Sequence, residues 1–114
     1  MNIRGEAIGQ WSVLHVTGNI DAINGDQLRG AVEEPLRNGA TQVCLDLGGV
    51  EFINSAGLVA LVSSLKAVRA KKGRFVLTGL RSYVQEVFQV TELDRFFDIV
   101  PSTAALTESA PSEK

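Results

Sequence analysis

Cysteine, histidine, tryptophan, tyrosine and methionine are scarce in this chain, since each occurs once among 114 residues. The single cysteine, Cys44, excludes an internal disulfide and agrees with a reducing compartment, so we expect a cytoplasmic protein. One histidine and one cysteine cannot supply the four ligands of a usual His–Cys metal site. We therefore expect no metal and no cofactor, and we interpret Cys44 as a small core residue and His15 as a structural one.

Long apolar runs and an excess of one charge are also missing. The longest apolar stretches, such as residues 58–62, span about five residues, far below the roughly 20 that a membrane helix needs. Eleven Lys and Arg against 13 Asp and Glu leave a net charge of −2, which gives no drive for nucleic-acid binding. Residues 1–6 lack the apolar core of a secretory signal. With 45% apolar residues, the chain is expected to fold as one globular domain.

Hydrophobic spacing predicts alternating strands and helices along the chain. Period-two patterns predict strands, and apolar residues three or four apart predict helices. The expected strands are 2–8, 11–17, 42–47, 74–78 and a brief 96–100. The expected helices are 22–37, a second that begins near Ser55 or Ala56 and stops at Gly73, a third over 81–89, and a last short one from Ser102 through Leu106. The second helix would bury Leu58, Leu61, Val62, Leu65 and Val68. We predict an α/β fold with a four- to five-stranded mixed sheet and helices packed mainly on one face.

Proline and glycine suggest where elements end. Pro35 lacks an N–H and disfavours helical angles at Glu34, so we expect the first helix to end or kink there. Gly73 is the expected stop of the second helix. Residues 1–108 would form the single domain, and residues 109–114, without apolar periodicity, a disordered tail.

Enzyme motifs are not recognisable in the sequence. Gly48 and Gly49 lack the Lys-Ser/Thr ending of a phosphate loop and are better explained as a turn. Ser55 does not stand in the Gly-x-Ser-x-Gly context of a nucleophile elbow. We therefore predict a protein that is not an enzyme.

One segment carries more information than the rest: residues 50–58, VEFINSAGL. It resembles the signature of STAS domains, the sulphate-transporter and anti-sigma-antagonist family, in which Asp-Ser-Ser-Gly-Leu leads from a short loop into a helix. Residues 17–21, TGNID, and the strand end at Asp46 and Leu47 match as well. The resemblance covers about residues 2–107 and implies the STAS fold. Two positions depart from the pattern, since Asn54 replaces the usual Asp and Ala56 the second Ser.

The resemblance also implies a function and its partners. In anti-anti-sigma factors the serine at the position of Ser55 is phosphorylated, which makes this chain an expected regulator of transcription by partner switching. The partner would be an anti-sigma factor that is also a serine kinase and binds the ATP; a serine phosphatase would reverse the reaction. The alternative is a non-phosphorylated STAS subunit of a larger complex, such as a lipid-transport ABC system.

Several residues at and near Ser55 could have either of two roles. Ser55 itself could be only the N-cap of the second helix, and Asp21 the cap of the first, or both could belong to the partner-binding surface. Gly57 would leave room for a partner's backbone or a nucleotide beside Ser55. Val59 and Ser63 fall off the buried helical stripe, on the side expected to be exposed. The expected partner-binding residues are Asp21, Asn54, Ser55, Ala56, Gly57, Val59 and Ser63.

Overall fold

The elements of the chain follow the expected alternation of strands and helices. A computed structural model describes residues 1–108, and the tail expected at 109–114 lies outside these described residues. In chain order the elements are β1 (Asn2–Ile8), β2 (Trp11–Thr17), α1 (Ala22–Arg37), β3 (Gln42–Gly49), α2 (Ser55–Ala70), β4 (Arg74–Thr78), α3 (Ser82–Val90), the 3₁₀ helix η1 (Leu93–Arg95), β5 (Asp98–Val100) and α4 (Ala105–Glu108).

The strands form one mixed sheet, as the sequence predicted, and the structure places its five strands in the order β1-β2-β3-β4-β5. β1 and β2 are antiparallel, whereas β2, β3, β4 and β5 run parallel to one another. The two-residue link of the hairpin places Gly9 at a φ of +60°. Glycine at the first position of such a link matches a type II′ turn, which suits the twist of the paired strands. β1 is therefore fixed as the outer strand at one edge of the sheet.

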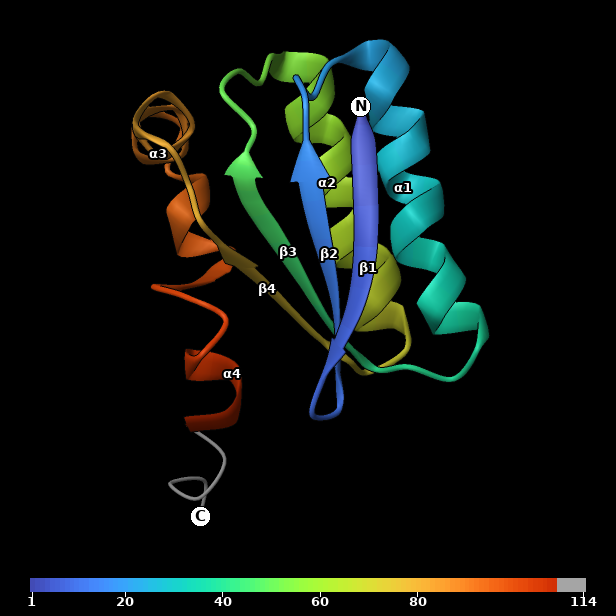
Figure 1. The fold of residues 1–114 in the computed structure, drawn as a ribbon. Coiled ribbons are helices and arrows are strands. Elements are labelled where there is room, and N and C mark those ends of the chain that lie inside the picture. Colours follow the sequence, from blue (N-terminus) through green and yellow to red (C-terminus); the bar gives the residue numbers. More distant parts are fainter. Residues whose placement is uncertain (109–114) are drawn as a thin grey trace.

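Helices cover the two faces of the sheet unequally. Figure 1 shows α1 and α2 side by side on one face, where they bury Leu28, Val32, Leu61 and Val68 in the main core. The α3 residues Val84 and Phe88 join the same core. The opposite face has a smaller core, in which Leu106 of α4 packs with Trp11, Val13, Cys44 and Val76. The helices thus lie mainly on one face, as predicted.

Several element boundaries differ from the sequence predictions. β3 ends two residues later than expected, α3 begins and ends one residue later, and β5 begins two residues later. α1, α2 and α4 differ as well. α1 runs through Pro35 to Arg37, so of the end or kink expected near Glu34 the end is wrong. Only two helical residues follow Pro35. The Pro35 carbonyl accepts from the N–H groups of Asn38 and Ala40, and Leu36 is buried, so these contacts hold the end of the helix. At the end of α2 the left-handed residue is Lys72, with a φ of +58°, and not Gly73. α4 begins at Ala105, three residues after Ser102.

Cys44 has the buried position that the sequence indicated. Its side chain lies in the smaller core, and burial raises the pKa of its thiol to about 12, with the nearby Asp46 carboxylate adding to the shift. The thiol therefore stays protonated at neutral pH.

His15 lies on the face of the sheet opposite α1 and α2, between two carboxylates. Its Nε2 is 2.6 Å from Glu6 Oε1 on β1, and its Nδ1 is 2.6 Å from Asp46 Oδ2 on β3. These hydrogen bonds, first that of Glu6 and then that of Asp46, raise the pKa of His15, while partial burial and Arg4 oppose the shift. His15 therefore links three neighbouring strands and has the structural role predicted for it.

Replacing His15 with Gln is expected to make stability less dependent on pH. Because the folded-state pKa is raised, the imidazolium contacts stabilise the fold fully below the unfolded pKa near 6.5, and this contribution is lost as pH rises through the higher folded-state value. The pairs are partly exposed, so the wild-type advantage at pH 5.5 should be at most about 1 kcal/mol. Urea midpoints of both proteins at pH 5.5 and pH 9 measure it; an equal difference at both pH values would contradict it.

Candidate functional site around Ser55

Two loops meet at the carboxyl ends of the parallel strands β2 and β3. Main-chain hydrogen bonds join them: Gly18 N–H donates to Gly49 O over 3.0 Å, Ile20 N–H to Phe52 O over 3.0 Å, and Asn54 N–H to Ile20 O over 3.2 Å. Ile20 and Ile53 form a short parallel bridge, and both side chains are buried. The loop before α1 is thereby held against the loop that leads into Ser55.

Asn54, and not Ser55, is the N-cap of α2. Asn54 has extended backbone angles (φ −110°, ψ −176°), and its Oδ1 accepts from the N–H of Gly57 over 2.9 Å. Asparagine caps helices as well as aspartate does, so the departure at this position keeps the cap without the charge. Ser55 is the first helical residue and is exposed. The capping role that the sequence allowed for Ser55 is therefore wrong, and its hydroxyl is left for other contacts.

Gly57 does not open space for a partner, contrary to the sequence interpretation. The residue is buried, and a Cβ at this position would stand 2.1 Å from the carbonyl oxygen of Ile20. The space above Gly57 is thus filled by the chain's own loop. Glycine is needed here because α2 approaches that loop too closely for any side chain.

Asp21 caps α1 in the same way that Asn54 caps α2. Its Oδ1 accepts from Asn24 N–H over 2.9 Å, and the residue is half-buried. The capping reading of Asp21 is therefore correct. Because Asp21 directly follows Ile20, the same loop also brings it near Asn54, which keeps a contact role compatible with the structure.

Exposed apolar side chains surround the start of α2. Ile23, in the first turn of α1, is 83% exposed, Val59 on α2 is 61% exposed, and Phe52 before α2 is 42% exposed. Phe52 stacks on Tyr83 of α3, with ring centroids 5.5 Å apart. Sequence reasoning missed Ile23 and Phe52, although Ile23 stands outside the apolar stripe of its helix. We define the Ser55 surface as Asp21, Ile23, Phe52, Asn54, Ser55 and Val59.

The remaining expected contact residues are less accessible. Ala56 and Ser63 are half-buried, so of the two α2 residues expected on the exposed side, Val59 is exposed and Ser63 only partly so.

The arrangement of the first turn of α2 favours a negative group on the Ser55 hydroxyl. Asn54 engages the N–H groups of Gly57 and Leu58, which leaves those of Ser55 and Ala56 at the positive end of the helix dipole.

Two kinds of feature are absent from residues 1–108, a metal site and a membrane-spanning helix. No group of three or more His, Cys, Asp or Glu side chains in that range is arranged to hold a metal ion. Among the helices of the same range, none combines the length and the apolar character that crossing a membrane requires.

Comparison with known proteins gives a consistent set of relatives. The family model described as STAS domain matches residues 2–106. BtrV of Bordetella bronchiseptica, named as a candidate anti-sigma factor antagonist, is 32% identical over 88 residues, which cover 77% of this chain and 76% of BtrV. The crystal structure of a candidate anti-sigma factor antagonist from Thermotoga maritima has a TM-score of 0.86 at 24% identity and covers 96% of this chain and 94% of its own. SpoIIAA of Bacillus, solved in the phosphorylated form, has a TM-score of 0.70 at 19% identity, over 94% of this chain and 98% of its own.

Alanine substitutions at Asn54 and Ser55 should separate the cap from the exposed hydroxyl. Asn54→Ala removes the side-chain bond to Gly57 N–H and should cost about 1 kcal/mol of unfolding free energy. Ser55→Ala removes no bond within the domain and should stay within about 0.5 kcal/mol of wild type. Chemical denaturation of the three proteins measures both; a loss at Ser55 as large as that at Asn54 would show that the hydroxyl contributes to the cap after all.

Proposed function

Because residues 2–106 make this chain a member of the STAS domain family, we propose that it is an anti-sigma factor antagonist. It binds an anti-sigma factor through the Ser55 surface in this proposal, and phosphorylation of Ser55 releases it. The names of the relatives support the anti-sigma factor as partner. The exposed hydroxyl of Ser55 at the start of α2 is the single observation that carries the phosphorylation step.

The domain can accept a phosphate at Ser55 without refolding. The hydroxyl points from the first turn of a 16-residue helix, where unpaired N–H groups and the helix dipole favour a dianion. The cap is supplied by Asn54, so modification of Ser55 breaks no hydrogen bond of the fold. A similar fold, that of SpoIIAA, is known in both an unphosphorylated and a phosphorylated form.

The same phosphate would oppose partner binding. Ile23, Phe52 and Val59 give the Ser55 surface exposed apolar groups of the kind that protein interfaces bury. A dianion among them must lose water when the partner covers the surface, which costs binding energy. Since about 1.4 kcal/mol changes affinity tenfold, one phosphate is enough to switch the interaction.

The enzymes of the cycle are supplied by the partners in this proposal. The anti-sigma factor would be a serine kinase that binds ATP and transfers its γ-phosphoryl group to Ser55 Oγ, and a serine phosphatase would hydrolyse the phosphoserine. Uncharged Asn54, in place of the usual aspartate, would leave the kinase to recognise the apolar residues and the main chain around Ser55 instead of a carboxylate.

Ser55 variants test the switch against a purely structural role. Ser55→Ala should bind the partner in the presence of ATP, because no phosphate is added, whereas Ser55→Asp should fold normally and bind more weakly, by about tenfold or more. The probe is the cognate anti-sigma factor with serine-kinase activity, and the readouts are calorimetric affinity and mass spectrometry after incubation with ATP.

Ser82 is the matched control for this experiment. It is also an exposed serine at the first position of a helix, α3, but lies outside the Ser55 surface. Ser82→Ala should leave both phosphorylation and binding unchanged. Phosphate found on Ser82 with Ser55 unmodified, or equal affinity of all variants, would refute the proposal.

A further inference from the structure

β1 presents a free backbone edge over its whole length. It is the outer strand of the sheet, and no other strand of residues 1–108 pairs with its far side. In the antiparallel hairpin every second residue directs its N–H and C=O away from the partner strand. Because Ile8 and Trp11 close the two-residue turn as a hydrogen-bonded pair, the residues that face outward are Ile3, Gly5 and Ala7.

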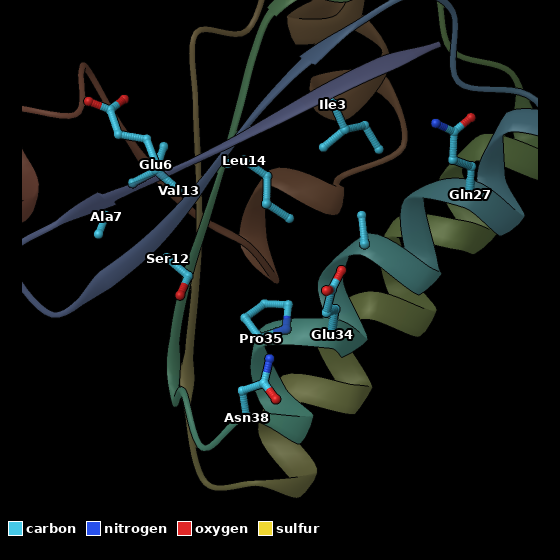
Figure 2. A pocket seen from close by; sticks show the side chains of 12 residues that line it. Ile3, Glu6, Ala7, Ser12, Val13, Leu14, Gln27, Glu34, Pro35 and Asn38 are labelled. Carbon is cyan, nitrogen blue, oxygen red and sulfur yellow. The ribbon is translucent and has the colours of Figure 1, made fainter.

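Beside this edge lies a hollow of about 480 Å³ between β1 and α1, which we name the β1 groove. Figure 2 shows Ile3 and Leu14 on the strand side and Gln27, Glu34 and Pro35 on the helix side. Small residues keep the strand side open: a Cβ at Gly5 would meet only Leu14, at 3.9 Å, and Ala7 is the next residue on the same face. The groove thus has room for an apolar side chain from a strand added at the edge.

The charges on β1 are arranged symmetrically about Gly5. Arg4 and Glu6 flank it and share the opposite face of the sheet, since they stand across from His15 and Val13. If a second β1 adds antiparallel with Gly5 opposite Gly5, each Arg4 faces the Glu6 of the other copy. The same register sets the outward residues of one copy against those of the other and places each Ile3 opposite an Ala7, beside the groove.

Other antiparallel registers are disfavoured by the same two charges. Matching outward-facing residues requires shifts of two residues at a time. A shift in one direction puts Arg4 opposite the second Arg4, and a shift in the other puts Glu6 opposite the second Glu6. Like charges directly across a strand pair are destabilising, so the register centred on Gly5 is the one that the sequence selects.

We infer that this chain self-associates through β1, forming a two-fold dimer in which two five-stranded sheets become one continuous sheet centred on Gly5. The main-chain groups of Ile3, Gly5 and Ala7 supply the hydrogen bonds, Arg4 and Glu6 set the register, and Ile3 of each copy fills the other's β1 groove beside Ala7. The occupant of this edge is therefore a second copy of the chain. The contact is formed by a single strand from each copy, so the dimer is expected to be reversible and concentration-dependent.

Charge reversal provides the test. Arg4→Glu and Glu6→Arg each turn both cross-copy contacts into like-charge contacts, so each variant alone should dimerise about tenfold or more weakly than wild type. Mixed in equal amounts, the two variants restore opposite charges at both contacts and should form a heterodimer. Sedimentation equilibrium from micromolar concentrations to about 1 mM measures the rise from 12.2 kDa toward twice that mass.

Two further variants test whether the change in dimerisation is specific to the β1 edge. Arg95→Glu makes the same charge change on exposed η1 and should leave dimerisation unchanged. Gly5→Pro removes an outward N–H without touching the ladder to β2, so it should fold, as circular dichroism can check, and abolish the dimer. A wild-type chain that stays monomeric at about 1 mM, or variants that dimerise without regard to charge, would overturn the proposal and leave the edge to a segment of another protein. Ser55→Ala should dimerise like wild type, so failure of this proposal is distinct from failure of the phosphorylation switch.

Discussion

The contact between the Ile20 carbonyl and the α2 backbone at Gly57 is the constraint on which the functional end of the molecule depends. It lets the loop before α1 lie directly against the first turn of α2, where Ile20 exchanges main-chain hydrogen bonds with Phe52 and Asn54. Because both loops are fixed by backbone groups, the exposed side chains of Ser55 and Ile23 do not have to support the fold. Their identity is therefore free to be determined by what they bind.

Asn54 and Ser55 have separate roles in this arrangement. Asn54 completes the helix and Ser55 remains chemically available, although the two are adjacent in sequence. A motif in which the modified residue also capped the helix would couple each phosphorylation to a loss of stability. In the switch proposed for Ser55, a phosphate would add charge while the start of the helix stays the same, and its effect on a partner would act through electrostatics and desolvation.

Much of the fold could be predicted because periodicity reports burial. The alternation of Val43, Leu45 and Leu47 and the helical spacing of Leu61, Leu65 and Val68 led to the correct elements and to the mixed sheet. Local rules failed where tertiary contacts decide: Leu36 is buried and holds the end of α1 after Pro35, and the Ile20 carbonyl occupies the space that Gly57 seemed to offer. Ile23 and Phe52 were missed because exposure of an apolar residue depends on how two loops meet, which a single sequence does not state.

The reactivity of the Cys44 thiol depends on local opening of the structure around it. With the thiol enclosed between the sheet and α4 and its pKa raised to about 12, it offers almost no thiolate to oxidants or alkylating reagents while the sheet is intact. Modification must then wait for an event that separates α4 from β2 and β3. The rate at which the Cys44 thiol is labelled therefore measures how often α4 separates from the second face of the sheet.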